Sequence, residues 1–217
     1  MKRPSLLVTL LLLTGCSAGG GASAVGTASP SRPATSAGPT AAPTTAPTRS
    51  PAGGPTAVPA EKNPPGDIPD NIAFVGYRNA AGRYTFAHPE GWSESTKTST
   101  VTFTDKLNGV YALSGAATAA PTVDTANRQD VPALKSGQAA FELRGVTAVT
   151  VPGGKGVRIV YRRNSAPDPV TGRQYRDEVE RYEIVAGSRE VIVELFGPVG
   201  ADNVDAYKTM IDSLRLA

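Results

Sequence analysis

The chain has 217 residues, of which 40% are hydrophobic and 19% charged, with a single cysteine and a single histidine. The formal net charge is +3, from 22 basic and 19 acidic residues, and it falls to +1 without Lys2 and Arg3. The remaining basic residues are scattered among acidic ones, so the chain lacks the basic patch of a nucleic-acid-binding protein. One cysteine and one histidine also exclude a structural zinc site, which takes about four ligands.

The first fifteen residues, 1–15, have the features of an export signal. Lys2 and Arg3 provide a positive start, and an apolar run over 6–13 follows, interrupted only by Thr9. This run is much shorter than the roughly 20 residues that span a bilayer as a helix. We therefore predict a signal peptide rather than a permanent membrane helix.

The segment Leu13-Thr14-Gly15-Cys16 resembles the lipobox of bacterial lipoproteins, in which an aliphatic residue and two small residues precede a cysteine. The resemblance implies that Cys16 receives a diacylglyceryl group, that cleavage precedes Cys16, and that acyl chains such as palmitate modify the new N-terminus. At about 0.8 kcal/mol per buried CH₂, several acyl chains hold a protein stably on a bilayer. An ordinary secretory signal that contains a cysteine is the alternative. The lipobox predicts a lipid anchor on the extracytoplasmic face of the cell membrane and leaves inner or outer membrane open.

Proline, threonine, alanine, serine and glycine dominate the next segment, 16–69. Such a composition does not bury enough apolar surface to offset the entropy of ordering, so we predict a disordered linker. At about 3.1 Å per residue, it would reach at most roughly 160 Å from the lipid surface. The Thr/Pro pattern also resembles that of O-glycosylated stalks, and it leaves glycosylation open.

The rest of the chain, 70–217, is predicted to be one globular domain of ordinary size. Its first half contains alternating, strand-like segments and one helical segment. In chain order these are a strand at 83–86, a turn at His88-Pro89-Glu90-Gly91-Trp92, a strand at 100–105, a turn at Asn108-Gly109 leading into 110–113, and a short helix over 124–136. Pro132 disrupts that helix unless it starts a second helical segment.

Four further strands are predicted at 140–151, 156–163, 176–185 and 190–196. Because their connections are short, they favour an antiparallel meander. The chain then ends in a helix for which Asp202 is the predicted cap and Asp205 lies in the first turn. Its apolar stripe is predicted to pack on the sheet, and it comprises Val204, Tyr207, Ile211 and Leu214.

Two segments, YTFAHPEGW at 84–92 and DAYKTMIDSLRL at 205–216, resemble the entry motif and the terminal helix of the PsbP-like fold. Similar domains occur in many actinobacterial surface lipoproteins, in photosystem extrinsic subunits and in a small-GTPase-binding protein. The resemblance covers roughly 77–217 and implies an α+β fold with a central antiparallel sheet and packed helices, in an α/β/α arrangement. It also implies binding or scaffolding rather than catalysis, although fold by itself does not determine function.

The turn near residue 90 carries the only histidine and the only tryptophan. His88 lies between a predicted strand and Pro89, so we interpret it as a turn residue rather than as a catalytic base or metal ligand. Trp92 directly follows the turn, and we expect its ring to fold back over the core. The alternative is that Trp92 is an exposed anchor for a partner or a sugar.

An acidic cluster is the only pattern that suggests an enzyme. It comprises Asp177, Glu178, Glu180 and Glu183. Paired carboxylates of this kind carry out glycoside hydrolysis. We favour cross-strand ion pairs with the arginines of the neighbouring strand, Arg158, Arg162 and Arg163, over catalysis. No nucleophile elbow, P-loop or metal motif is present in the sequence, so we predict no enzyme and no cofactor.

The loop at 164–176 is polar, contains two prolines and ends in Arg-Gln-Tyr-Arg. A stiff loop loses less entropy on binding, and arginine and tyrosine are favoured contact residues. We therefore predict binding residues in this loop, namely Asp168, Arg173, Tyr175 and Arg176.

These features lead to three functional hypotheses. The first is a lipid-anchored, non-catalytic protein that recognises an envelope protein and contacts the membrane through acylated Cys16. The second is a lipoprotein that binds a lipid, a glycan or another small ligand in a cleft between sheet and helices. The third is an envelope hydrolase that uses Asp177, Glu178 and Glu180. The identity of the partner and the oligomeric state stay open.

Overall fold

A computed structural model describes residues 54–59 and 66–217. The chain divides into two units, Met1–Ala52 and Gly53–Ala217, and the features below belong to the second. The predicted signal peptide, Cys16 and most of the predicted linker therefore lie outside the described residues. Within the described part of the chain, no helix is long and apolar enough to cross a membrane.

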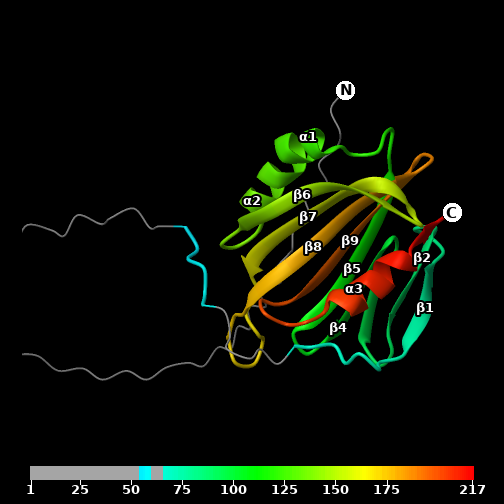
Figure 1. Cartoon of the computed structure of the whole chain (residues 1–217). Coiled ribbons are helices and arrows are strands. Elements are labelled where there is room, and N and C mark those ends of the chain that lie inside the picture. The colour runs from blue at the N-terminus through cyan, green and yellow to red at the C-terminus, as the bar shows by residue number, and fades with distance from the viewer. Residues whose placement is uncertain (1–53, 60–65) are drawn as a thin grey trace, which may run out of the picture. The chain divides into compact units, whose positions relative to one another are not determined.

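The second unit is a mixed α+β structure with two antiparallel sheets (Figure 1). The large sheet has the strand order β3-β4-β5-β9-β8-β7-β6. Its strands are β3 (Ser93–Lys97), β4 (Thr100–Asp105), β5 (Asn108–Ala116), β6 (Glu142–Val151), β7 (Gly154–Asn164), β8 (Arg176–Ala186) and β9 (Arg189–Pro198). The small sheet has the order β1-β2-β10, with β1 (Phe74–Asn79), β2 (Tyr84–Pro89) and β10 (Arg215–Leu216).

The helical segments are α1 (Val123–Thr125), a π-helical turn η1 (Ala126–Asp130), α2 (Val131–Gly137) and α3 (Val204–Asp212). Thr122 caps α1 through a capping box with Thr125. Pro132 lies in the first turn of α2, where a missing N–H costs nothing, so it starts a second helical segment as the sequence allows. The predicted helix over 124–136 is thus present as three consecutive helical pieces.

Strands β6 to β9 form the predicted antiparallel meander, since each pairs with its neighbour in the sequence. Strand β5 joins the meander through β9, with Val110 opposite Leu195. Strands β1, β3 and β10, and the separation of the small sheet from the large one, were not predicted. The predicted fold class, an antiparallel sheet with packed helices, is confirmed.

The main core lies between the large sheet, the small sheet and α3. Figure 1 shows α3 running across the front of the large sheet. The fully buried residues of the main core include Tyr84, Phe103, Leu195, Met210 and Leu214. Each large side chain removed from water contributes about 1.5–3 kcal/mol, so this cluster accounts for much of the stability. Trp92 belongs to the same cluster and is only 8% exposed, as predicted.

The opposite face of the large sheet has its own smaller core. Alternate residues of β7, namely Val157, Ile159 and Tyr161, point to this face because successive side chains of a strand alternate. They pack against Ala126 and Leu134 of the segment that runs from α1 to α2. The large sheet is therefore covered by helical segments on both faces.

Two of the predicted details of α3 are wrong. Asn203, not Asp202, is the N-cap residue, and its side chain makes no capping hydrogen bond. It instead accepts a hydrogen bond from the backbone N–H of Ile68 at 2.8 Å and donates one to Asn108 Oδ1 at 3.0 Å. Val204, predicted to be part of the buried stripe, is 69% exposed.

Two residues shortly before the predicted domain boundary at residue 70 contact the rest of the domain. Ile68 is 5% exposed and belongs to the main core. The carbonyl of Gly66 accepts a hydrogen bond from Asn108 Nδ2 at 2.7 Å. Gly66 is thus held to β5 by a hydrogen bond, and Ile68 is held by the N-cap residue of α3 and by apolar packing.

Candidate functional site

The strand alternation of β8 divides the predicted acidic cluster between the two faces of the large sheet. Glu178 and Glu180 lie on the face that carries α3. Asp177 and Glu183 lie on the face that carries α1 and α2. The four carboxylates therefore do not converge on one site.

On the α3 face, each glutamate is held by an arginine of β7. Glu178 Oε2 accepts a hydrogen bond from Arg162 Nε at 2.8 Å. Glu180 forms an ion pair with Arg158 through Oε1 and accepts a hydrogen bond from Tyr182 OH at 2.8 Å through Oε2. The predicted cross-strand ion pairs are confirmed, and both oxygens of Glu180 have partners.

On the other face, Arg181 is the centre of a buried ionic cluster. It contacts Glu183 at 2.7 Å through Nε and Glu194 at 2.6 Å through Nη1. Nearby, burial raises the pKa of Asp177 to about 6, although Arg163, at 3.7 Å, favours its charged form. Asp177, Glu183 and Glu194 are 3%, 2% and 8% exposed, so the cluster is part of the interior rather than an open site.

The structure corrects the interpretation of His88. It is a buried residue of β2, paired opposite Val75 of β1, rather than a turn residue. Its Nδ1 lies 2.9 Å from the carbonyl oxygen of Pro89. The predicted turn follows it at Glu90 and Gly91, where Gly91 has a φ of 82°. Among the described residues, no group of three or more histidine, cysteine, aspartate or glutamate side chains is arranged to hold a metal ion.

A hollow on the described surface lies between α3 and strands β6 to β8, and we call it the α3 groove. It has a volume of about 330 Å³. It is lined by Val149, Thr150, Val151, Arg158, Glu180, Tyr182, Val204, Tyr207, Lys208, Ile211 and Asp212. The groove therefore combines an apolar floor with the Arg158–Glu180–Tyr182 hydrogen-bonded set, and exposed Val204 lies at its edge. The second sequence-based hypothesis expected a cleft between sheet and helices, but the sequence did not identify the lining residues, because the two walls are far apart in the chain.

Three of the four residues predicted to bind a partner lie in the loop between β7 and β8. Asp168 Oδ1 accepts hydrogen bonds from the backbone N–H groups of Val170 and Thr171, at 3.0 and 2.7 Å. The contacts with Thr171, followed by that with Val170, lower the pKa of Asp168. The guanidinium of Arg173 lies 5.0 Å from the ring centroid of Tyr175, a cation–π contact. A role for these residues in binding stays a prediction.

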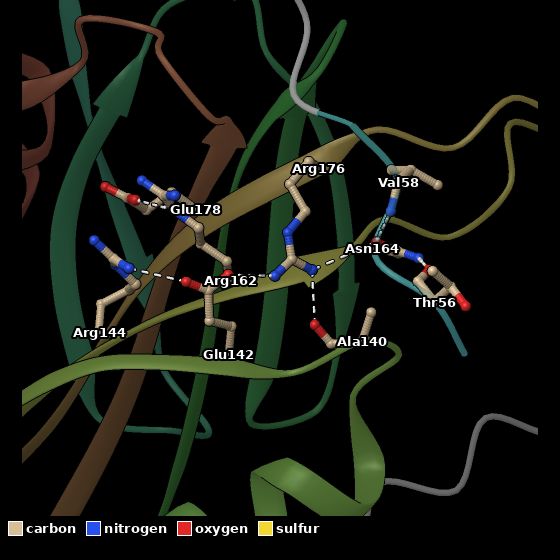
Figure 2. Close-up of polar contacts among 9 residues, drawn as sticks. All are labelled: Thr56, Val58, Ala140, Glu142, Arg144, Arg162, Asn164, Arg176 and Glu178. Atoms are coloured by element: carbon tan, nitrogen blue, oxygen red, sulfur yellow. Dashed lines mark hydrogen bonds and ion pairs between the residues drawn. The ribbon is translucent and has the colours of Figure 1, made fainter. Parts of the chain in front are cut away.

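The fourth predicted residue, Arg176, points into the protein and is 5% exposed (Figure 2). Its Nη1 donates to the carbonyl oxygen of Ala140 at 2.7 Å and to Asn164 Oδ1 at 3.4 Å. Its Nη2 donates to Glu142 Oε2 at 2.9 Å. Arg176 therefore ties the end of β7 to the start of β6, and its guanidinium is not on the surface with Arg173 and Tyr175.

Asn164, the last residue of β7, contacts a segment more than a hundred residues earlier in the chain. Figure 2 shows its side chain between Arg176 and the segment Thr56–Val58. Asn164 Nδ2 donates to the carbonyl oxygen of Thr56 at 2.8 Å, and Oδ1 accepts from the backbone N–H of Val58 at 3.1 Å. Asn164 is 6% exposed. The sequence placed Asn164 at the start of the polar loop at 164–176 but did not predict a contact for it.

No family model matches the chain, and no curated protein matches it. Solved structures do resemble it. The PsbP protein CyanoP of Synechocystis sp. PCC 6803 is 14% identical, with 70% of this chain and 99% of that chain covered and a TM-score of 0.49. LpqN of Mycobacterium tuberculosis, described as involved in cell envelope biogenesis, is 12% identical over 68% of this chain and 92% of that chain, with a TM-score of 0.41. The Ran-binding protein Mog1p of Saccharomyces cerevisiae is 7% identical over 67% of this chain and 96% of that chain, with a TM-score of 0.44. At these values the comparisons assign no partner and no site residue to this chain.

Proposed function

We propose that this chain is a lipid-anchored extracytoplasmic protein whose domain binds a protein partner in the cell envelope and carries out no chemistry of its own. The lipobox-like segment ending in Cys16 supports the anchor. The Pro- and Thr-rich composition of 16–69 supports a spacer between anchor and domain. The α3 groove supports the binding role and is its proposed site.

The composition of the α3 groove carries this proposal. Arg158, Tyr182 and Tyr207 line it, and arginine and tyrosine are enriched among the residues that dominate binding energy at protein interfaces. Glu180 holds both Arg158 and Tyr182 through its two oxygens. Because these side chains are already ordered, they lose less entropy when a partner covers them.

The edge of the groove favours a protein over a small ligand. Its volume of about 330 Å³ is at the lower end of the range of about 300–1,000 Å³ for small-molecule sites. Val204, one of the residues that line the groove, is 69% exposed. A partner that fills the groove and also covers Val204 is therefore larger than a compact ligand.

A small lipid or glycan is the second candidate, because the groove volume is sufficient for one. A hydrolase that uses Glu178 and Glu180 is less consistent with the geometry. Each glutamate is already engaged by an arginine of β7, and Glu180 also accepts a hydrogen bond from Tyr182. A glycosidase needs both carboxyl groups to face the bond that it cleaves.

Photo-crosslinking in intact cells tests the binding site. A photoreactive amino acid at position 204 should capture one defined protein, whereas the same group at Val170, which is 90% exposed in the loop, should not. Lys208→Glu at the groove should reduce the yield, and Lys135→Glu, at an exposed position of α2, should not. A lipid or glycan adduct at position 204 would support the small-ligand alternative instead. Crosslinks only at position 170 would contradict the groove as the site.

Cell fractionation tests the anchor separately. The wild-type chain should remain with membranes after a high-salt wash, and Cys16→Ser should abolish acylation and leave an uncleaved or released protein. If Cys16→Ser is still processed and retained on membranes after that wash, the lipid anchor is wrong. Ser17→Ala, one residue further on, serves as the matched control and should remain anchored.

A further inference from the structure

Strand β6 is an edge strand of the large sheet (Figure 1). Among the described residues, β6 pairs only with β7, and no turn or loop adds a main-chain hydrogen bond to it. Thr147, Ala148 and Thr150 are exposed, so α1 and α2 do not cover the strand at these positions. An open strand edge presents unpaired N–H and C=O groups, to which a further strand can be added.

The two edges of the large sheet differ in how they are protected against such pairing. The opposite edge, β3, has five residues, all of them exposed, and it carries Glu94 and Lys97. Short, charged strands are a common protection of sheet edges. Strand β6 has ten residues, and its segment GVTAVTV at 145–151 contains no charge and no proline. Five of these seven residues are β-branched, which favours strand pairing. Charge and length therefore protect β3 but not β6.

Features that stop a ladder of paired residues lie at both ends of this segment. At one end Arg144 is an extra residue, because the pairing with β7 passes from Leu143 to Gly145. At the other end Pro152 has no N–H to donate. The part of β6 that can pair with a further strand is therefore 145–151.

A second copy of the same segment fits this edge. Two antiparallel copies of 145–151 pair over their whole length when Ala148 lies opposite Ala148 of the second copy. Val146 then lies opposite Thr150 of the second copy, and Thr147 lies opposite Val149 of the second copy. No like charges meet in this register, and β-branched side chains meet in four of the seven pairs. A shift of the register would bring the bulge or the proline into the ladder.

This register also matches the two faces of the sheet. Val146 packs on the smaller core, whereas Val149 and Val151 pack on the main core, on the α3 side. Because side chains alternate, Thr147 shares the face of Val149, and Thr150 shares the face of Val146. Directly opposite residues of an antiparallel pair also lie on one face. Each face of one copy therefore continues into the same face of the second copy.

We propose that this chain forms a two-fold symmetric dimer through β6, in which residues 145–151 of two copies pair as antiparallel strands. The two seven-stranded sheets then become one continuous sheet. Because Val149 and Val151 also line the α3 groove, both grooves lie on one face of this sheet, on either side of the shared strand pair. The pairing itself does not depend on what the groove binds. One strand pair is a small interface, so the dimer should depend on concentration.

Disulfide trapping in intact cells tests the register. In the full chain with Ala148→Cys, the two thiols face each other, since directly opposite Cβ atoms are about 4.5–5.5 Å apart. Mild oxidation should give a covalent dimer of the chain that a reducing agent separates. Thr150→Cys is the matched control, because it is exposed on the same face. Its counterpart lies four residues further along the pair, about 13 Å away, which is too far for a disulfide.

The yields decide whether the register is correct. Ala148→Cys should form more dimer than Thr150→Cys and more than the wild type, whose only cysteine is Cys16. Equal yields, or no dimer in Ala148→Cys, would overturn the proposed pairing. A disulfide-linked product of Ala148→Cys with another mass would assign the edge to a different protein and also overturn the dimer.

A charge exchange at the same position separates self-pairing from loss of the fold. Two differently tagged wild-type copies should co-purify. Ala148→Glu in both copies, or Ala148→Lys in both, places like charges opposite each other and should abolish co-purification. One copy of each variant should restore it, because opposite charges then meet. Position 148 is exposed, so each variant should keep the melting temperature of the wild type. Co-purification that persists between like-charged copies, or that the mixed pair does not restore, would overturn the dimer through β6.

Discussion

The imidazole of His88 is stacked on the ring of Phe103, with 3.7 Å between the ring centroids and 15° between the ring planes. Its Nδ1 lies 2.9 Å from the carbonyl oxygen of Pro89. Because a carbonyl only accepts hydrogen bonds, Nδ1 carries the proton of the neutral ring. Burial lowers the pKa of His88 below its ordinary value of 6.5, against smaller opposing effects of Pro89 and Glu94. The folded state therefore favours the uncharged imidazole.

This arrangement predicts a loss of stability in mild acid. Below pH 6.5 the unfolded chain protonates at this histidine before the folded chain does, so the free energy of unfolding decreases as the pH falls. Above pH 6.5 the histidine is neutral in both states, so His88 causes no loss of stability there. As the pH falls from 6.5 toward the lowered pKa of the folded state, the free energy of unfolding decreases. His88→Gln should remove it, which is measured as a smaller fall in melting temperature between pH 7 and pH 5. An unchanged pH profile in His88→Gln would contradict the lowered pKa.

Asp177 should give the opposite pH dependence in the same range. Burial raises its pKa to about 6, so the folded chain binds a proton there before the unfolded chain does, whose pKa is about 3.9. At pH 7 the buried, charged carboxylate of Asp177 therefore lowers the free energy of unfolding. As the pH falls from 7 toward 4 the folded chain takes up the proton, and up to about 3 kcal/mol of this loss is recovered. Asp177→Asn should make the fall in stability below pH 6.5 steeper than in the wild type. Urea unfolding at several pH values measures this slope, and Asp105→Asn on the exposed end of β4 is the control.

The alternation of apolar and polar residues was sufficient to predict strands that bury one face. Strands β4, β7, β8 and β9 were predicted within a few residues, because their apolar side chains alternate. Strand β3 was not, since every residue from Ser93 to Lys97 is exposed and no apolar period exists. Its position depends on backbone pairing with β4 and on a hydrogen bond between Thr96 Oγ1 and Tyr77 OH of β1 at 3.2 Å.

The turn predicted at Asn108-Gly109 is two residues too late, although the rule behind it is sound. The pair is typical of tight turns, yet the turn lies at Lys106 and Leu107, and Lys106 has a φ of 50°. Gly109 is instead paired with Phe196 in the sheet, and a Cβ on it would lie 2.1 Å from Phe196 Cζ. Position 109 therefore requires glycine because the ring of Phe196, which follows much later in the chain, leaves no room for a side chain.

The candidate sites were harder to predict than the fold. The α3 groove is formed by β6, β7, β8 and α3, and two hydrogen bonds join Asn164 to Thr56 and Val58. Arg176 resembled a binding residue because it ends a polar loop, but β8 begins there and its side chain points inward. Contacts of this kind depend on long-range packing, which no single segment encodes.

The position of Ile68 predicts where proteolysis stops. Its side chain is in the main core, and Asn203 and Asn108 bind the backbone at Ile68 and Gly66. We expect limited proteolysis to leave a cooperative fragment that begins before Gly66. Mass spectrometry of the fragment measures this limit, and Asn203→Ala should shift it toward residue 70. A stable fragment that begins after residue 70 with an unchanged melting temperature would show that the Ile68 contact is dispensable.

Trp92 should be one of the largest single contributors to the stability of the domain. It is 8% exposed and belongs to the main core with Phe86 and Phe103. Replacement of a buried tryptophan by alanine costs roughly 3–5 kcal/mol, because the cavity collapses only in part. That is a large share of the roughly 5–15 kcal/mol that stabilises a typical domain. Trp92→Ala should therefore lower the urea midpoint strongly, and Trp92→Phe, which retains a ring, should lower it less.

Since Trp92 is the only indole, native fluorescence reports on it alone and should be blue-shifted and protected from acrylamide. Emission like that of free tryptophan, together with an unchanged melting temperature in Trp92→Ala, would instead assign Trp92 to the surface as a binding anchor.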